Sequence, residues 1–392
     1  MLNKHNTQCC YVVSEQACLY PFTGAGRHIQ TGLEQLSRSF NVNLVTFCRP
    51  LSDEAISLAL ESGHAASKMK GGYARRFFGS WIRWWLILFQ NHKNFIKHYR
   101  VIRKEAPRFI YERAAYLNYT GLLISKIMRI PHFYEVNGIY YRDNETRFPS
   151  LYNTFARIME RKAYKSTSCF FVGGLNHELG IPESSKSYVI QNGIDASFLE
   201  VFKMSKSNPD NHHKVNILFV GHAMPHHRFD ILVQAIAAMR YKERVTLHLV
   251  GSNFEQYLDD LYANAIGTEQ YGVLGHSELV PILHQMDIGV VPFAEDYYSN
   301  MKVFLYGAAG LAVVLPMSRN FLNIFSHSEA VFFENMSIRG LSAALDDIVV
   351  NRAYYRQMGH RCRDKIAHGY TWDRIFDEII KRIQEIENSA LA

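Results

Sequence analysis

The sequence has no long apolar run, and this absence limits where the protein can work. Its most apolar segment, residues 81–89 (WIRWWLILF), is far below the roughly 20 residues that a membrane-spanning helix needs, and Arg83 interrupts it. Near the start of the chain only the short stretch CCYVV is apolar, which is too little for a secretory signal peptide. We therefore expect a cytoplasmic protein that neither crosses a membrane nor is exported.

Regular cysteine spacing is also missing. The six cysteines contain no CxxC pair of the metal-binding kind; they are Cys9, Cys10, Cys18, Cys48, Cys169 and Cys362. This usage suits a reducing cytosol, where we expect free thiols. The sequence also has no low-complexity tract. Hydrophobic residues make up 48% and charged residues 20% of the chain, which is typical of an ordinary globular protein.

The pattern of apolar stretches predicts an α/β fold with two domains. Stretches such as CCYVV, RFIYER and SCFFVGG are typical of buried strands, with helical stretches between them, and the same alternation starts again at VNILFVG. Such alternation is typical of a parallel sheet with helices on both faces. Because 392 residues exceed what one core organises, we predict two Rossmann-like, doubly wound domains that face each other across a cleft.

The predicted domain boundary lies in the polar stretch SKSNPDNHHK (205–214), which has the composition of a linker. The predicted parts are an N-terminal acceptor-binding domain at 1–204, with a basic aromatic insert at about 68–104, a C-terminal donor-binding domain at 214–372, and a C-terminal helix at 373–392. Within the second domain, YGVLG (271–275) is predicted as a strand, and two helices are predicted after the last strand.

Two turns of the second domain are suited to hold an anion. The strand VNILFVG ends at Gly221 and leads into HAMPHHRFD, where backbone N–H groups at the start of the next helix and the basic side chains can meet phosphate oxygens. In the second turn, SNMKVFLYGAAG, Lys302 opens a helix, where a cation opposes the helix dipole unless an anion is bound. The alternatives are a solvated loop and a surface lysine without a role.

A third turn, FTGAGRH, lies after the first strand of the chain. Its glycines, Gly24 and Gly26, allow close approach of backbone to a ligand before a helix that we expect to begin near His28.

These stretches resemble a known family. VNILFVGHAMPHHRFD, VTLHLVG, VLGHSELVPILHQMDIGVVPF, SNMKVFLYGAAGLAVV and YTWDR are similar to the donor half of the retaining GT-B glycosyltransferases of family four, and RFIYERAAYLNYTGLLISKIMRIPHFYEVNG and VIQNGID are similar to its first half. The resemblance covers nearly all of the chain outside about 50–106. It implies the GT-B fold and transfer of a sugar from a nucleotide diphosphate to an acceptor, with the anomeric configuration retained.

The resemblance also implies donor-binding residues. In the family, a basic residue matching His227 and the turn matching 299–303 meet the leaving diphosphate, and the glycine loop closes from the other side; such donors stabilise charge that develops on a leaving group. The donor-binding set that we expect consists of Gly24, Gly26, Gly221, His222, His227, Arg228, Gly251, His276, Ser299, Asn300, Met301, Lys302, Val303 and Leu305.

The chain departs from the family in the turn after Gly221. Members commonly carry an Arg after the strand glycine and a Lys before a Gly, whereas this chain has His222, His227 and Arg228 at those positions. Neutral His contributes only a hydrogen bond near pH 7. We therefore expect Arg228 and Lys302 to supply permanent positive charge, and we predict that both are catalytic.

A further departure concerns the nucleotide. Leu305 stands where the FEY motif of the family has a glutamate that contacts the ribose, and leucine cannot accept that hydrogen bond. Glu295 or Asp296 in the preceding loop are the candidate substitutes, with solvated loop acids as the alternative. No acidic cluster of the DxD kind lies near the diphosphate turn, so no metal is expected.

The first domain supplies the expected acceptor side. Asn137 in EVNG stands where the family often has a His near the donor sugar, and we predict that it is catalytic. Glu112, Arg113 and Glu135 fall at strand ends and could orient an acceptor or a sugar hydroxyl. The alternative for these three is a set of structural ion pairs.

The insert combines positive charge with aromatic residues. Between Lys68 and Lys104 there are ten Lys or Arg and no Asp or Glu, and three of the four tryptophans lie there. Trp81, Trp84, Trp85 and Leu88 are predicted to share a helical face that lies in the interface of an anionic bilayer. The membrane-contact residues that we expect are Arg76, Trp81, Arg83, Trp84, Trp85 and Lys93. The alternatives are a helix packed on its own domain and a nucleic-acid surface, which no fold-level feature supports.

Together these features favour a hexosyltransferase-type enzyme, peripheral to the cytoplasmic membrane face, that extends a growing glycan or glycolipid. The donor is expected to be a UDP-sugar, with a GDP-sugar as second choice, and no other cofactor is expected. The expected partners are the nucleotide sugar, a glycan or lipid-linked acceptor and an anionic membrane surface, without nucleic acid. The alternative function is a catalytically silent homologue that binds a nucleotide or a partner.

Overall fold

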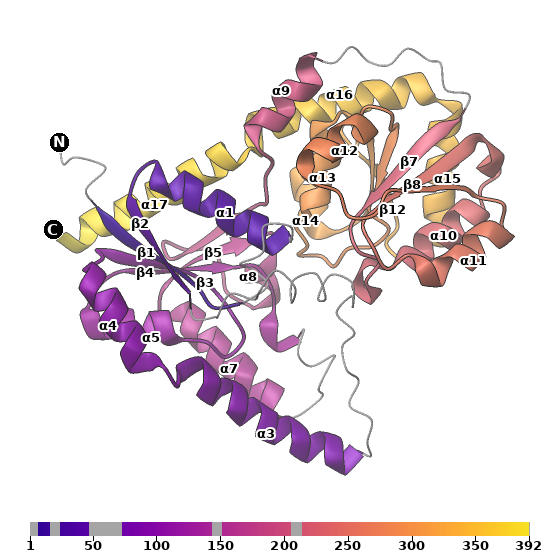
Figure 1. Cartoon of the computed structure of the whole chain (residues 1–392). Helices are drawn as coiled ribbons and strands as arrows, with labels where there is room; N and C mark the ends of the chain where they lie inside the picture. Colours follow the sequence, from indigo (N-terminus) through magenta and orange to yellow (C-terminus); the bar gives the residue numbers. More distant parts are fainter. Residues whose placement is uncertain (1–6, 16–23, 47–72, 143–150, 205–213, 392) are drawn as a thin grey trace. The chain divides into compact units, whose positions relative to one another are not determined.

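The structure is a computed structural model that describes residues 7–15, 24–46, 73–142, 151–204 and 214–391 (Figure 1). The chain divides into two compact units, residues 1–190 with 376–392, and residues 191–375. The division therefore lies after Ile190 rather than in 205–214, and helix α9 (Ala196–Met204) belongs to the second unit. The reason is packing, because Phe198, Leu199 and Phe202 of α9 are buried in a core of that unit.

The first unit contains a six-stranded sheet with every neighbouring pair parallel, in the order β2-β1-β3-β4-β5-β6. Its strands are β1 (Gln8–Val13), β2 (Asn41–Thr46), β3 (Phe109–Arg113), β4 (His132–Val136), β5 (Ser168–Val172) and β6 (Ser187–Ile190). The central strands β3, β4 and β5 are buried along their whole length, as continuous apolar runs in a parallel sheet require. The predicted parallel sheet is confirmed.

Helices cover both faces of this sheet. They are α1 (Gly24–Ser37), α3 (Tyr73–His92), α4 (Phe95–Glu105), α5 (Thr120–Met128), α7 (Leu151–Lys165), the short α8 (Leu175–Glu178) and, from Phe376, α17 (Trp372–Leu391). Figure 1 shows α4, α5 and α7 on one face and α1 and α17 on the other. Side chains alternate accordingly: Cys10 and Val12 of β1 join Ile102 of α4, whereas Tyr11 meets α1 and α17 at Gly32 and Phe376.

The second unit repeats the architecture with a sheet of order β12-β11-β10-β7-β8-β9, also parallel between all neighbours. Its strands are β7 (Val215–Val220), β8 (Val245–Val250), β9 (Gly267–Gln270), β10 (Ile288–Val290), β11 (Ala312–Pro316) and β12 (Val331–Phe333). Besides α9, its helical elements are η3 (Pro225–His227), α10 (Phe229–Ala237), η4 (Lys242–Arg244), α11 (Glu255–Ala263), α12 (His276–Leu283), α13 (Met301–Ala308), α14 (Arg319–Ile324), α15 (Ile338–Val350) and α16 (Arg352–Gly369).

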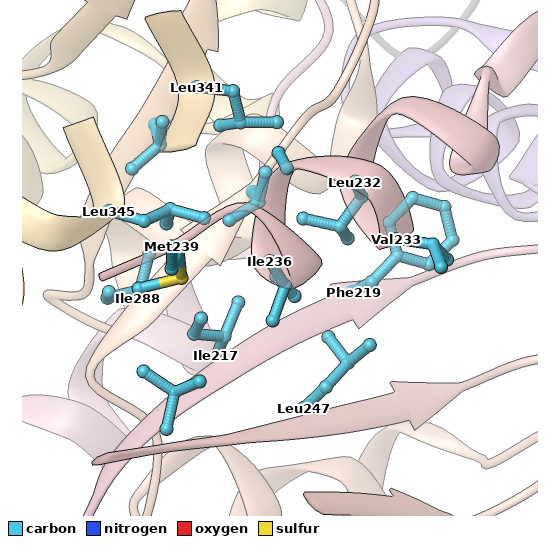
Figure 2. Close-up of a cluster of buried hydrophobic side chains, with 14 of the residues drawn as sticks. Ile217, Phe219, Leu232, Val233, Ile236, Met239, Leu247, Ile288, Leu341 and Leu345 are labelled. Carbon is cyan, nitrogen blue, oxygen red and sulfur yellow. The ribbon is translucent and has the colours of Figure 1, made fainter. Parts of the chain in front are cut away.

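Two hydrophobic cores lie on opposite faces of this sheet. Ile217 and Phe219 of β7 point into one core, and Leu218 between them belongs to the other. Figure 2 shows the first core, where side chains of α10 and α15, such as Ile236 and Leu345, meet the strands. Burial of each large side chain stabilises the unit by about 1.5–3 kcal/mol, so this sheet is a rigid support for the loops at its edge.

Three details of the prediction were wrong. Residues 271–275 lie in a loop, and the strand β9 precedes them at Gly267–Gln270, where the polar sequence GTEQ on a half-exposed edge gives no apolar signal. Three helices rather than two follow the last strand, α15, α16 and α17, because Asn351 separates α15 from α16. Helix α1 begins at Gly24 rather than near His28, so Gly24 and Gly26 belong to its first turn. The backbone N–H groups of a first turn have no hydrogen-bond partner within the helix.

Two further sequence expectations concern the described residues. Cys9, Cys10, Cys169 and Cys362 are buried free thiols, as predicted, while Cys18 and Cys48 lie outside the described residues. No helix in the part of the chain that the structure describes is both long and apolar enough to cross a membrane.

Candidate functional site

Each sheet has a point where the strand order reverses, and in open parallel sheets ligands bind in the crevice outside the carboxyl ends of the strands at that point. In the second sheet β7 lies between β8 and β10, so this rule places a ligand between the turn after β7 and the loop that leads from β10 to α13. In the first sheet β1 lies between β2 and β3. The predicted site residues group around these two positions, and each unit is described in turn.

Two glycines shape the turn after β7. Gly221 and Gly251 adopt φ values of +133° and +135°, which L side chains rarely adopt. A Cβ atom on Gly251 would lie 2.0 Å from the carbonyl oxygen of Gly221, so the ends of β7 and β8 can approach only because residue 251 has no side chain. Gly221 and Gly251, two of the four glycines predicted to bind the donor, therefore lie next to each other at this turn.

The histidines of this turn are held by local hydrogen bonds. The ring of His222 lies 2.6 Å from the Ser252 hydroxyl (Nδ1 to Oγ), and Nδ1 of His227 contacts the carbonyl oxygen of His222. Burial, together with the charge of Lys302, lowers the pKa of His227 to about 3. His227 is therefore neutral at pH 7 and can offer a hydrogen bond but no charge, as the sequence predicted.

Arg228 occupies a left-handed backbone conformation, with φ 47° and ψ 48°. This is the position where the resembled family commonly has glycine, so the chain keeps the shape of the turn and places an arginine in a conformation that glycine adopts without strain. The guanidinium of Arg228 is bonded to Asp230 at 2.8 Å (Nη2 to Oδ2), and both side chains are about one-third exposed. The cation that we expect to supply permanent charge is therefore paired with a carboxylate.

Lys302 lies on the other side of the crevice, in the first turn of α13. Its ammonium Nζ lies 4.3 Å from the centre of the Phe219 ring, and a Cβ atom on Gly221 would lie 3.2 Å from it. Among the described residues, no carboxylate lies within ion-pair distance, and burial lowers the pKa of Lys302 to about 7. Lys302 therefore holds its proton less firmly than an ordinary lysine, so its charge depends more on pH than the sequence led us to expect.

The loop before α13 is anchored within the second unit. Asn192 donates its backbone N–H to the Ser299 hydroxyl at 3.0 Å and its amide to the Ser299 carbonyl oxygen. Asn300 is the N-cap residue of α13 but makes no capping hydrogen bond with its side chain. The first turn of α13, with Met301, Lys302 and Val303, therefore presents backbone N–H groups and a positive dipole end beside the ammonium.

In α13, residues 304–306 (FLY) stand where the resembled family has its FEY motif. Leu305 is only 9% exposed and packs in a core, so no polar group replaces the family's glutamate there. Tyr306 accepts the backbone N–H of Val220 at 2.8 Å, and its ring fills the space over Gly289. Asp296, a candidate substitute, instead accepts the backbone N–H of Arg319 at 3.1 Å and so caps α14.

In the first unit, the carboxylate of Glu135 is the centre of a buried network. Oε1 lies 2.8 Å from Nε2 of His28, 3.0 Å from Nη1 of Arg113 and 2.6 Å from the amide of Asn137, and Tyr111 donates its hydroxyl to Oε2 at 2.7 Å. Burial alone would raise the pKa of Glu135, but His28, Arg113 and Tyr111 together lower it to about 2. The carboxylate is ionised and fully partnered.

Of the residues expected on the acceptor side, the structure brings Arg113 and Glu135 together, with Asn137 beside them, but it places Glu112 elsewhere. Successive residues of β3 point to opposite faces, so Glu112 lies under α5, where it accepts the backbone N–H of Leu122 at 3.1 Å and lies 2.8 Å from His132 Nε2. Glu112 is 1% exposed. A contact of Glu112 with an acceptor was therefore a wrong expectation, and its role is structural.

The tryptophans of α3 do not share one surface. Trp84 is 4% exposed and packs on Phe155 of α7 with ring centres 5.7 Å apart, whereas Trp85 is 52% exposed. The expected bilayer contact of Trp84 was wrong, because its ring belongs to the interior. Lys93 is exposed. The side chains of Arg76, Trp81 and Arg83, and likewise that of His276 in α12, lie outside the described residues.

Several residues of these sites were missed by the sequence analysis. They are Phe219 beneath the ammonium of Lys302, Tyr306 at the end of β7, Ser252 beside His222, and His28 and Tyr111 around Glu135. Phe219, Tyr111 and Tyr306 lie in apolar strands or helices, where a sequence pattern indicates only burial. His28 follows the predicted glycine turn directly, and that position was the one available signal.

Comparisons with known proteins agree with this geometry. Residues 228–381 match the family model described as glycosyl transferase-like. A glycosyltransferase from Rickettsia africae superimposes with a TM-score of 0.70 at 12% identity, over 98% of this chain and 99% of that one. The sucrose-phosphate synthase of Thermosynechococcus elongatus gives 0.70 at 10%, over 98% and 100%. HepE of Anabaena, in a complex with UDP and glucose, gives 0.68 at 12%, over 97% and 100%. No curated protein sequence matches the chain.

At these identities the solved structures establish the fold, and the family model covers residues 228–381. Both sheets, their strand order and the turn at Gly221 are in place. The chain therefore has the GT-B fold, and its C-terminal part is a glycosyltransferase domain.

Proposed function

We propose that the protein transfers a sugar from a nucleotide diphosphate donor to a glycan or a lipid-linked acceptor, with retention of the anomeric configuration. The observation that carries this proposal is Lys302, a partly buried ammonium with a lowered pKa and without a carboxylate partner among the described residues. It lies beside the turn at Gly221, at the strand-order reversal of the second sheet. A diphosphate bound there would supply the missing negative charge.

The chemistry asked of this site is stabilisation of a leaving group. As the bond between the sugar and the diphosphate breaks, negative charge grows on the diphosphate oxygens, and fixed donors aimed at that charge lower the barrier. Lys302 would supply the charge, while the neutral ring of His227 and the first turn of α13 would supply hydrogen bonds. Arg228 would join them if its guanidinium exchanges Asp230 for phosphate.

A UDP-sugar is the proposed donor, with a GDP-sugar as the second candidate. The support is the fold shared with HepE, whose complex contains UDP and glucose. Leu305 offers no ribose acceptor, so we propose that the nucleotide is held mainly through its diphosphate.

The acceptor side is proposed to lie at the Glu135 network of the first unit. Glu135 fixes the side chains of Arg113 and Asn137, which would orient an acceptor hydroxyl. A lipid-linked acceptor would be met at the cytoplasmic face of a membrane.

The test is a panel of UDP-, GDP- and ADP-sugars with the purified full chain. Slow hydrolysis of one donor, with release of the sugar in its original anomeric configuration by proton NMR, is expected for a retaining transferase. The variant Lys302→Met should lose binding and hydrolysis together, while the matched control Lys242→Met, on η4, should keep both. Inversion of the released sugar would contradict the retaining mechanism.

A second candidate function is a silent homologue that binds a nucleotide or a partner without transferring sugar. Two observations favour it, namely the core position of Leu305 and the pairing of Arg228 with Asp230. Donor binding that depends on Lys302, without turnover of any donor in the presence of membrane lipid extracts, would support this candidate over the enzyme.

A further inference from the structure

Helix α3 carries an apolar stripe that the rest of the described chain leaves uncovered. Ile82, Trp85, Leu86 and Phe89 are 54%, 52%, 53% and 66% exposed. Their spacing of three, four and seven residues places all four on one side of the helix. Trp84 lies between them in sequence but points into the unit. The stripe is therefore a continuous surface and not a scatter of single residues.

The stripe continues onto neighbouring helices of the same unit. Asn91 near the end of α3 donates to the carbonyl oxygens of Tyr116 and Leu117, just before α5, and the Trp84 ring packs on Phe155 of α7. Figure 1 shows α3 beyond α5 and α7, on their side away from the sheet. Exposed apolar side chains on these helices and on α4 are Ile96 (64%), Leu123 (42%), Ile127 (57%), Phe155 (51%) and Ile158 (56%).

The charge on these helices has one sign. Ten Lys and Arg side chains on α4, α5 and α7 and in the short connections next to them are exposed: Lys93, Lys97, Arg100, Arg103, Lys104, Lys126, Arg129, Arg157, Lys162 and Lys165. Among the described side chains of α3, α4, α5 and α7, no Asp or Glu is exposed, because Glu160 is buried and Glu105 accepts hydrogen bonds from Gln8 and Asn43. We call these exposed apolar and basic side chains the basic-apolar face.

We propose that the basic-apolar face docks on the surface of an anionic lipid bilayer. Aromatic and aliphatic side chains of an interfacial helix enter the boundary between headgroups and acyl chains, while Lys and Arg contact lipid phosphates. This inference deepens the proposed function, on which its biological purpose rests, because a lipid-linked acceptor is reached from such a surface. It also assigns the membrane contact to Trp85 and its stripe, in place of Trp84.

Charge complementarity decides the occupant. A second copy seated on the same face would oppose exposed cations with further cations, and like charges across an interface are unfavourable. An anionic bilayer instead presents lipid phosphates that attract such cations. The basic-apolar face offers both an apolar stripe and exposed cations, and two weak signals together can hold a protein on a membrane.

The experiment is co-sedimentation of the full chain with vesicles of phosphatidylcholine alone or mixed with phosphatidylglycerol, without any sugar nucleotide. Wild type is expected to bind the anionic vesicles at low salt, to be released at high salt, and to bind the neutral vesicles weakly. The variant Trp85→Ser/Phe89→Ser should lose about tenfold or more in partition. The matched control Tyr262→Ser/Tyr354→Ser removes two equally exposed aromatic side chains from the second unit and should change nothing.

A second pair of variants tests the charge without touching the stripe. Lys97→Glu/Arg100→Glu on α4 should weaken binding to anionic vesicles by about tenfold or more, whereas Arg244→Glu/Lys381→Glu, which makes the same change of net charge elsewhere, should weaken it only slightly. Wild type that stays in the supernatant with anionic vesicles at low salt would overturn the proposal. So would a stripe variant that binds vesicles normally but shifts from dimer to monomer in sedimentation analysis, which would identify a second copy as the occupant.

Donor binding separates this inference from the proposed function. A chain that binds a UDP-sugar but not vesicles refutes the membrane face alone, and a chain that binds vesicles but no sugar nucleotide refutes the donor site alone.

Discussion

The two units place opposite charges at the carboxyl ends of their sheets, and they differ in how those charges are compensated. In the first unit, the buried carboxylate of Glu135 has four donors within 3.0 Å, and its pKa falls to about 2. In the second unit, the ammonium of Lys302 has an aromatic ring at 4.3 Å and no carboxylate among the described residues, and its pKa falls to about 7. Removing one partner of a buried ion pair such as that of Glu135 is expected to destabilise the fold. A cation such as Lys302, which has no carboxylate partner among the described residues, is expected to bind an anionic ligand instead.

The largest expected effect follows from breaking the compensated side. Glu135→Ala would leave His28 and Arg113 buried without their anion, which should lower the stability of the first unit by about 3–5 kcal/mol. Thermal denaturation of the variant measures this loss, and Glu183→Ala, on an exposed loop, serves as a control. A variant that melts within a degree of wild type would show that the network contributes little.

The pH dependence of stability sharpens the same point. The folded pKa of Glu135 lies below its unfolded value of 4.5, so its contribution is fully present above about pH 4.5 and is lost as the pH falls toward 2. The stability advantage of wild type over Glu135→Gln should therefore shrink between pH 5 and pH 3 in urea titrations. An advantage that is the same at both pH values would contradict the lowered pKa.

A change on the uncompensated side should affect binding more than folding. Lys302→Met removes the charge that a diphosphate would meet, and the expected loss of donor affinity is about 100-fold. The same variant removes a desolvated cation, so the protein should gain about 1–2 kcal/mol of stability. Calorimetric titration and thermal denaturation measure the two effects. Loss of both affinity and stability would mean that Lys302 is a structural residue.

The smallest expected effect concerns Arg228 in the turn after β7. Arg228→Gly relieves a left-handed conformation at φ 47°, which should stabilise the second unit by about 1 kcal/mol relative to Arg228→Ala. Both variants lose the partly exposed ion pair with Asp230, so that loss cancels in the comparison. Equal melting temperatures of the two variants would contradict the strained turn.

The sequence predicted the sheets well because parallel strands buried on both faces are continuous apolar runs, as in FIYER and VNILFV. It failed at β9, whose residues GTEQ pair on an edge and need no apolar character. It also misplaced the unit boundary, since a polar stretch indicates exposure but not which unit its flanking helix contacts. The apolar residues Phe198 and Phe202 decide that question through packing.

For the sites, sequence patterns located the turns but not the state of the charges in them. The cluster after Gly221 and the lysine that opens α13 were found from their positions at strand and helix ends. The pairing of Arg228 with Asp230, two residues further along the chain, depends on the left-handed turn at Arg228, which the sequence pattern did not reveal. The burial of Lys302 depends on distances between separate elements, which no local pattern contains. The helical periodicity of α3, which is apolar on most sides, likewise did not predict that Trp84 faces inward and Trp85 outward.

The most direct test of the donor site is the affinity for a UDP-sugar, measured by calorimetry from pH 6 to pH 8.5 in wild type and in Lys302→Arg. Binding of a diphosphate favours the protonated ammonium, so wild-type affinity should be greatest below pH 7 and fall by about tenfold above it. The arginine variant, which stays charged, should show no such fall. A wild-type affinity that does not change with pH, or the same decline in Lys302→Arg, would contradict the assignment of Lys302 to the diphosphate.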